Sequence, residues 1–138
     1  MRGRRIAFDY GDARIGVAIC DPDGILATPL PFLDARKPKV IKDVVALFEE
    51  FQPIAIYLGK PKHLSGADGD SVAKVEVFAA EIRTVTETPI YFVDERLTTV
   101  DAQRKLREAG KSAKELRLLI DSMAAVAILE AGLASEAR

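Results

Sequence analysis

The chain has 138 residues, of which 49% are hydrophobic and 30% charged, with 20 basic side chains against 21 acidic ones. This balance excludes a protein that binds polyanions through a global positive field, although a local basic face is still allowed. A chain of this length and composition folds around a core of its own and needs no disulfide or metal for stability. We therefore expect a single domain over residues 1–138.

The cysteine count and the apolar runs indicate a cytoplasmic location. The only cysteine, Cys20, lies in an apolar run and is expected to be a small buried side chain. The apolar stretch that follows the basic N-terminus is interrupted at Asp9 and therefore lacks a signal-peptide core. No stretch approaches the roughly 20 apolar residues of a membrane span, so we expect no membrane partner.

Three apolar segments open the chain and predict an antiparallel meander. Ile6–Asp9 and Ile15–Cys20 flank a short turn that contains glycine and aspartate, and this spacing predicts a hairpin. A second turn follows at residues 21–24. Ile25–Phe32 then carries two prolines, which are typical of a strand at the edge of a sheet because proline cannot donate to a hydrogen-bond ladder.

The rest of the chain alternates helices with strands. The order predicts an α/β fold in which a mixed five-stranded sheet is covered by helices on both faces. Apolar periodicity and turn residues predict, in order, a helix over Val40–Phe51, a strand over Ile54–Gly59, a loop over Lys60–Asp70, a helix over Val72–Ile82, a strand over Pro89–Val93, a helix over Thr98–Ala109, and a final helix from Lys111 or Ser112 to about Ala134.

Three acidic residues stand where a carboxylate is costly. Asp9 and Glu95 each end an apolar strand, and Asp121 lies inside an apolar helical stretch. A buried carboxylate is strongly destabilising unless it is protonated, paired or bound to a metal. Each acid also has a plainer interpretation. Asp9 could cap a turn and Asp121 could be structural, while Glu95 could form a surface ion pair with Arg96.

If the three carboxylates converge, their chemistry favours a hard cation. Oxygen ligands without histidine or cysteine suit Mg²⁺ or Mn²⁺ rather than zinc. Two such ions about 4 Å apart can activate water and stabilise the leaving oxygen of a phosphodiester. The acids therefore predict nuclease chemistry. Neither Ser71 nor Cys20 has the sequence context of a catalytic nucleophile, which makes a hydrolase of the serine or cysteine type a poor alternative.

Four sequence blocks occur in an order that resembles one known family. They are residues 9–18 (Asp-Tyr-Gly-Asp-Ala-Arg-Ile-Gly-Val-Ala), Gly59-Lys60-Pro61 with Gly66, residues 94–99 (Asp-Glu-Arg-Leu-Thr-Thr) and residues 121–125 (Asp-Ser-Met-Ala-Ala). Together they closely resemble the YqgF/RuvX family of bacterial RNase H-like proteins. The resemblance covers roughly residues 4–133, and the block at residues 94–99 is its most distinctive part.

The resemblance implies an RNase H-like fold in which Asp9, Glu95 and Asp121 are the metal-binding catalytic acids. It also implies a Mg²⁺- or Mn²⁺-dependent endonuclease that acts on structured nucleic acid, in 5′-end processing of pre-16S rRNA, in Holliday junction resolution, or in both. A ribosomal precursor particle is then a further partner. The expected products carry a 5′ phosphate and a 3′ hydroxyl.

Two positions depart from the pattern of the family and its relatives. Related RNase H-like resolvases carry a further aspartate three residues after the helix aspartate, where this chain has Ala124. The chain therefore lacks that acid for a second metal ion. In the long loop the family often has Pro-Leu-Asn-x-Asp-Gly, whereas this chain has Pro-Lys-His-Leu-Ser-Gly at residues 61–66. No role of the family's asparagine is transferred to His63.

Basic residues in several segments are candidates for binding nucleic acid, because lysine and arginine track phosphates with little base preference. A run of four, at residues 36, 37, 39 and 42, could do so as well, and a solvated helix face is the plainer interpretation of such runs. Arg96 could instead pair with Asp94 or Glu95. The candidates are Arg14, Lys60, Lys62, His63, Arg96, Arg104, Arg107 and Lys111.

Two other function classes stay open at this point. A non-catalytic nucleic-acid-binding or ribosome-assembly module is suggested by Ala124, which stands where a fourth acid could have been. Half of an actin-like sugar kinase is suggested by the Asp-x-Gly sequence at residues 9–11, although such enzymes need two domains to enclose ATP. The sequence also leaves monomer and homodimer undecided.

Overall fold

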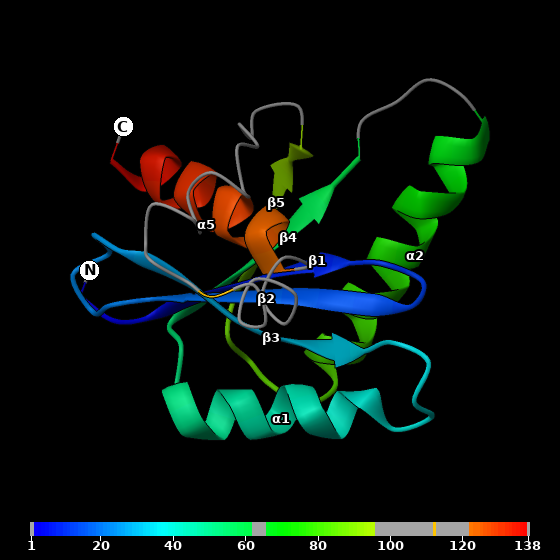
Figure 1. Ribbon diagram of the computed structural model, residues 1–138, viewed down its shortest axis with the longest axis horizontal. Helices are drawn as coiled ribbons and strands as arrows, with labels where there is room; N and C mark the ends of the chain where they lie inside the picture. Colours follow the sequence, from blue (N-terminus) through cyan, green and yellow to red (C-terminus); the bar gives the residue numbers. More distant parts are fainter. Residues whose placement is uncertain (1, 62–65, 96–111, 113–121, 138) are drawn as a thin grey trace.

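Five strands form one mixed sheet. They are β1 (Arg5–Tyr10), β2 (Arg14–Cys20), β3 (Ala27–Asp34), β4 (Ala55–Lys60) and β5 (Ile90–Asp94). Their spatial order is β3-β2-β1-β4-β5, with the first three antiparallel and β1, β4 and β5 parallel (Figure 1). This computed structural model describes residues 2–61, 66–95, 112 and 122–137. The predicted meander, and the edge position of the strand with two prolines, are confirmed.

Helices cover both faces of the sheet, as predicted. α1 (Val40–Phe51) and α2 (Gly66–Arg83) pack on one face, and α5 (Met123–Glu136) packs on the other (Figure 1). Within the described residues, no helix has both the length and the apolar character needed to cross a bilayer.

Two apolar cores form, one on each face. Phe8 packs edge-to-face against Phe48 and Phe78, with ring centroids 6.2 and 5.7 Å apart, so aromatic contacts join β1 to α1 and α2. The core under α5 contains small side chains such as Ala7 and Ala125, both fully buried. Small residues on both elements allow α5 to approach the middle of the sheet closely.

The parallel register brings the ends of β1, β4 and β5 to one edge of the sheet. Phe8 lies opposite Leu58, which places Asp9 beside Gly59 one step further along. Gly59 is in turn the register partner of Val93 on β5. Only β4 therefore separates Asp9 near the end of β1 from Glu95 just beyond β5. The residue of β4 that lies beside Asp9 is Gly59.

A buried serine ties the beginning of α5 to the meander. Ser122 is fully buried, accepts a hydrogen bond from the Val17 N–H at 3.0 Å, and donates one to the Leu30 carbonyl. Val17 and Leu30 are register partners next to an irregularity in the pairing of β2 with β3. The hydroxyl therefore satisfies backbone groups at a break in the ladder, and the residue before α5 is held against the sheet.

The third strand begins two residues later than predicted. Ile25 and Leu26 belong to the preceding turn and are 82% and 66% exposed. The physical reason is Asp21, whose Oδ1 accepts hydrogen bonds from the N–H groups of Ile25 at 2.9 Å and Leu26 at 2.6 Å. A side chain that captures these donors competes with strand pairing.

Helix α2 begins earlier than predicted, and the expected loop over Lys60–Asp70 is wrong in its second half. Gly66 and Gly69 lower helix propensity without preventing a helix, and acidic residues such as Asp70 are favourable near a helix N-terminus. The final helix is described from Met123 and ends at Glu136, two residues beyond the prediction. The helix predicted over residues 98–109 and the stretch 113–121 lie outside the described residues.

Candidate active site

Two of the three predicted acids are neighbours. Asp9 lies in β1, one residue before its end, and Glu95 directly follows β5. By strand alternation Asp9 shares the face of Ala7, which packs under α5, and Glu95 shares the face of Val93 in the same core. The side chains of Asp9 and Glu95 make a hydrogen bond with each other. The fold therefore brings together two carboxyl groups that are 86 positions apart in the sequence, the difference between 95 and 9.

A glycine between the two acids makes their approach possible. A Cβ atom at Gly59 would stand 2.8 Å from Oε1 of Glu95 and 2.4 Å from Cδ1 of Ile128. Both distances are shorter than van der Waals contact, so any side chain at this position would displace the carboxylate or the packed isoleucine. Gly59 thus provides the space in which Glu95 reaches across β4 toward Asp9.

Glu95 has a strongly perturbed acidity. Its pKa is raised from the ordinary value of 4.5 to about 7, first because burial penalises the charged carboxylate and second because the charge of Asp9 lies beside it. The hydrogen bond to Asp9 acts in the same direction, with protonated Glu95 as the donor. Such a pair holds a proton near neutral pH, and a divalent cation would relieve the same repulsion.

A small cavity of about 230 Å³ opens beside these acids, at the edge of the sheet where β1 ends. The turn between β1 and β2 forms one wall, and the first half of α2 forms another. Lys74 on the helix reaches across to the turn, where its Nζ lies 2.8 Å from Oδ1 of Asp12. The described residues that line the cavity are Asp9, Tyr10, Gly11, Asp12, Pro61, Ser71, Lys74, Val75 and Glu95.

The third predicted acid, Asp121, lies outside the described residues. Its neighbour Ser122 is described, and the hydroxyl of Ser122 is bonded to the backbone of Val17. Across residues 2–61, 66–95, 112 and 122–137, no group of three or more His, Cys, Asp or Glu side chains is placed to hold a metal ion. The described part of the site is therefore a carboxyl pair.

Two of the predicted nucleic-acid-binding residues are described. Arg14 is exposed at the start of β2, with its guanidinium 5.3 Å from the centre of the Phe32 ring. Lys60, at the end of β4, forms a 3.0 Å ion pair with Glu76 and lies 4.7 Å from the centre of the Phe92 ring. The other candidates, Lys62, His63, Arg96, Arg104, Arg107 and Lys111, fall outside the described residues.

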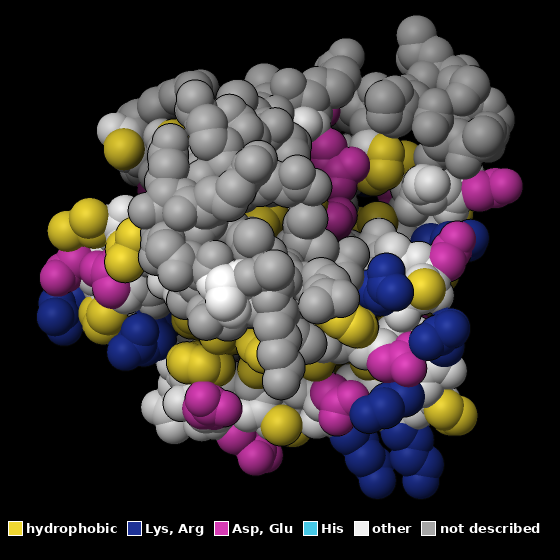
Figure 2. Space-filling view, viewed as in Figure 1, with side chains coloured by type: hydrophobic (Ala, Val, Ile, Leu, Met, Phe, Trp, Pro, Cys, Tyr) yellow, Lys and Arg dark blue, Asp and Glu magenta, His cyan; other side chains and the backbone are white. Residues whose placement is uncertain are grey.

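The basic run that precedes and enters α1 gathers on the surface, although acids partly neutralise it. Figure 2 shows Lys and Arg side chains collected at its lower right, over the connection from β3 to α1. Arg36 pairs with Asp34 at 3.2 Å and Lys37 with Asp43 at 3.8 Å. These exposed ion pairs are weak. The basic side chains therefore stay accessible to solvent, which suits either a solvated face or contact with phosphates.

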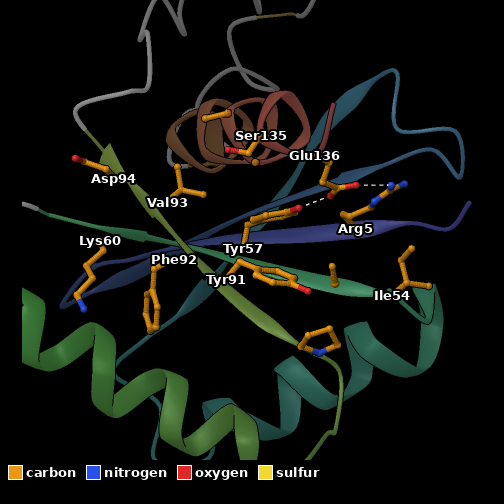
Figure 3. A pocket seen from close by; sticks show the side chains of 14 residues that line it. Arg5, Ile54, Tyr57, Lys60, Tyr91, Phe92, Val93, Asp94, Ser135 and Glu136 are labelled. Atoms are coloured by element: carbon orange, nitrogen blue, oxygen red, sulfur yellow. Dashed lines mark hydrogen bonds and ion pairs between the residues drawn. The ribbon is translucent and has the colours of Figure 1, made fainter. Parts of the chain in front are cut away.

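A larger groove lies along β5 and α5. It has a volume of about 860 Å³, and Figure 3 shows Tyr57 between Tyr91 and Glu136. Glu136 accepts hydrogen bonds from the Tyr57 hydroxyl and from Arg5, whose Nη2 lies 2.6 Å away. The groove meets the acid site only at its end, where Asp94 belongs to its lining. Arg5, Tyr57 and Glu136 in this groove thus hold the end of α5 to the sheet.

Sequence reasoning missed several residues that shape the site. Gly59 was noticed only as part of a family-like block, and its steric role appears when β4 is seen between the two acids. Ser71 and Lys74 were not predicted as site residues. Ser71 lies between the predicted loop and the predicted helix, and Lys74 lies within that helix, where no sequence signal relates it to the turn at Asp12, 62 positions away.

Comparison with known proteins identifies relatives over nearly the whole chain. The family model "RuvX: Holliday junction resolvase" matches residues 3–135. A Streptomyces avermitilis protein named "Putative pre-16S rRNA nuclease" is 48% identical over 137 residues, which span 98% of this chain and 88% of the relative. A Mycobacterium tuberculosis protein of the same name is 46% identical over 134 residues, covering 96% of this chain and 79% of the relative.

Solved structures support the fold. Thermus thermophilus RuvC in complex with a Holliday junction substrate aligns with a TM-score of 0.61 at 13% identity, covering 98% of this chain and 96% of RuvC. Fowlpox virus resolvase with its junction DNA aligns with a TM-score of 0.55 at 11% identity, covering 98% of this chain and 99% of the resolvase. At these identities the likeness concerns the fold, and the predicted RNase H-like architecture is confirmed.

Proposed function

The chain belongs to the RuvX family of Holliday junction resolvases, and we propose from this membership that it is a metal-dependent endonuclease that hydrolyses phosphodiester bonds in structured nucleic acid. Nuclease activity is supported by the family description and by the names of the relatives. We propose pre-16S rRNA, cut at its 5′ end, as the first substrate, since the relatives carry that name. A four-way DNA junction is the second.

One observation carries the proposal. Asp9 and Glu95 meet at the edge of the sheet, over a glycine that leaves room for them, and the pKa of Glu95 is raised to about 7. A purely structural acid would gain nothing from being buried beside a second acid, because the repulsion destabilises the fold. Perturbed carboxyl groups beside a cavity are typical of functional sites.

Asp121 is proposed as the third acid. It precedes Ser122, whose hydroxyl is bonded to the N–H of Val17. Val17 follows Gly16, the register partner of Asp9. Since consecutive Cα atoms are about 3.8 Å apart in any chain, this anchor supports a position for Asp121 near the other two acids.

The residues fit a hard divalent cation. Asp9, Glu95 and Asp121 would hold Mg²⁺ or Mn²⁺ through carboxylate oxygens, the ligands that these ions prefer. The pKa of Glu95 is raised by burial and by the charge of Asp9, and a bound cation would offset both effects, which supports this assignment. When bound, the ion would supply activation of water and stabilisation of charge at the phosphate. The chain itself contributes the orientation of the acids, through the strand ends and Gly59.

The basic residues named from the sequence would bind the phosphates of the substrate. The proposed set combines the two described residues with those beyond the described part of the chain: Arg14, Lys60, Lys62, His63, Arg96, Arg104, Arg107 and Lys111. A ribosomal precursor particle as the physical partner, a cytoplasmic location, a single domain over residues 1–138, and the choice between monomer and homodimer stay predictions.

The test is cleavage by purified variants in Mg²⁺ and in Mn²⁺. Asp9→Asn, Glu95→Gln and Asp121→Asn should each abolish cleavage of a 16S precursor and of four-way junctions while the circular dichroism spectrum is unchanged. Asp23→Asn is the matched control, since Asp23 is exposed, paired with Arg2 and located in the turn between β2 and β3. Cleavage at the wild-type rate by all three acid variants would overturn the proposal.

The same assay addresses the remaining alternative. Ala124 stands within α5 at the position where related resolvases carry a further acid, which favours a non-catalytic binding module as the second candidate. Binding of the precursor RNA with no cleavage in either metal, over a range of pH, would support the module. Cleavage at one defined position in only one substrate would identify the physiological class.

A further inference from the structure

We propose that Lys74 binds a backbone phosphate of the substrate strand next to the scissile bond, and that Asp12 holds its ammonium group in place until the strand arrives. The proposal rests on the proposed nuclease function. It adds a phosphate-binding subsite beside the acidic residues. Neither residue was among the candidates from the sequence.

Lys74 lies in the cavity that the acids line. Asp9, Glu95 and Lys74 line the same cavity of about 230 Å³, the acids from the strand ends and the lysine from α2. A strand whose scissile phosphate lies at the acids must carry its neighbouring phosphates across the rim of this cavity. Lys74 is the cationic residue in the described lining, and its side chain stands at that rim.

The ammonium group of Lys74 is held by a partner and is still accessible to a substrate. It lies 2.8 Å from the Asp12 carboxylate, with side-chain exposures of 52% for Lys74 and 77% for Asp12. Exposed ion pairs contribute little stability, so exchange of a carboxylate for a phosphate oxygen costs little. The hydrogen bond to Asp12 raises the pKa of Lys74, which keeps the group cationic.

The two elements that carry Asp12 and Lys74 are packed against each other. Tyr10, at the end of β1, packs on Phe78 of α2 with ring centroids 4.9 Å apart. Val75 and Phe78 are buried in the core beside Lys74. The turn with Asp12 and the helix with Lys74 therefore form a rigid frame, and the lysine is presented from a helix rather than from a loop.

Lys60 provides a contrast that favours Lys74 for this role. The ammonium group of Lys60 lies between the Glu76 carboxylate and the face of the Phe92 ring. It has two partners, and its side chain is only 29% exposed. Lys74 has more exposure, and it lines the cavity that the acids share.

The experiment combines binding and cleavage with four variants of the full chain. Fluorescence anisotropy measures the Kd of a labelled four-way junction and of a labelled 16S precursor fragment in EDTA, at several salt concentrations. Single-turnover cleavage in Mn²⁺ is measured with the same two substrates. The variants are Lys74→Met, Lys74→Arg, Asp12→Asn and the double variant that combines Lys74→Met with Asp12→Asn. Arg83→Met, in the last turn of α2, is the control.

Lys74→Met should weaken binding about tenfold at 0.1 M salt and reduce the slope of log K against log salt by about 1, as expected for the loss of one phosphate contact. Lys74→Arg and Arg83→Met should leave binding near the wild-type level. Asp12→Asn should change the Kd by different factors with and without Lys74, because the carboxylate acts on the substrate both through its own charge and by holding the ammonium group of Lys74.

Two results would overturn the inference: a salt slope for Lys74→Met equal to that of the wild type, or the same effect of Asp12→Asn with and without Lys74. Either can occur while the wild type cleaves normally, which leaves the nuclease function intact. Conversely, a wild type that binds but never cleaves would refute the nuclease function and still allow the phosphate contact to be measured.

Discussion

Replacing Gly59 by alanine should separate the effect of the site's geometry from that of overall stability. The new Cβ would lie 2.4 Å from Cδ1 of Ile128 and 2.8 Å from Oε1 of Glu95. Carbon atoms pack at about 3.5–4.0 Å, so the isoleucine must yield by more than 1 Å, in a core where it is 1% exposed. Overpacking of this kind costs about 1–3 kcal/mol, which corresponds to a fall in Tm of about 3–10 °C for a domain of this size.

The carboxylate of Glu95 must also shift from its position beside Asp9. Cleavage per folded molecule should therefore fall by more than the folded fraction explains. Gly132→Ala is the matched control, because its Cβ would stand 2.6 Å from the Tyr57 ring. Tyr57 precedes Gly59 by two residues in β4 and so lies farther from the acids. It should lower Tm by a similar amount and leave the specific cleavage rate unchanged. Thermal denaturation measures the Tm of each variant, and single-turnover cleavage at 20 °C measures its specific cleavage rate. Equal cleavage rates for the two variants would refute the reasoning that Gly59 positions Glu95.

Three further predictions concern pH and the contacts of α5. Because the pKa of Glu95 is raised to about 7, its protonation stabilises the metal-free fold fully below about pH 4.5, and this contribution is lost as pH rises through 7. Mg²⁺ should therefore raise Tm more at pH 8 than at pH 5, and a Tm gain that is equal at both pH values in the wild type, or equally large in Asp9→Asn, would contradict this. Ser122→Ala should destabilise the fold by about 1–3 kcal/mol, because two buried backbone groups lose their partner, and a chemical denaturation midpoint equal to the wild type would refute that role. Glu136→Gln should lower Tm while sparing specific cleavage, since Glu136 pairs with Arg5 far from the acids; unchanged Tm would show that the pair contributes nothing.

Local patterns in the sequence were enough to predict the architecture. Alternating apolar runs with turn residues located the meander, and apolar spacing located α1 to the residue, because both signals depend only on neighbours along the chain. One error, at the start of β3, occurred where a side chain competed with the backbone. Asp21 delayed β3 by capturing two N–H groups, a contact that strand periodicity does not report.

Which residues act together was decided by tertiary structure. Asp9 and Glu95 could be identified as costly acids from their apolar neighbours, and Asp121, which lies outside the described residues, stays a prediction of the same kind. Their adjacency depends on the parallel pairing of β1, β4 and β5, and on a glycine in the middle strand at the right level. Lys74 could not have been found, since its relation to the turn at Asp12 spans 62 positions. Composition and periodicity thus determine which segments form strands and helices, whereas the register between distant segments decides which side chains share a site.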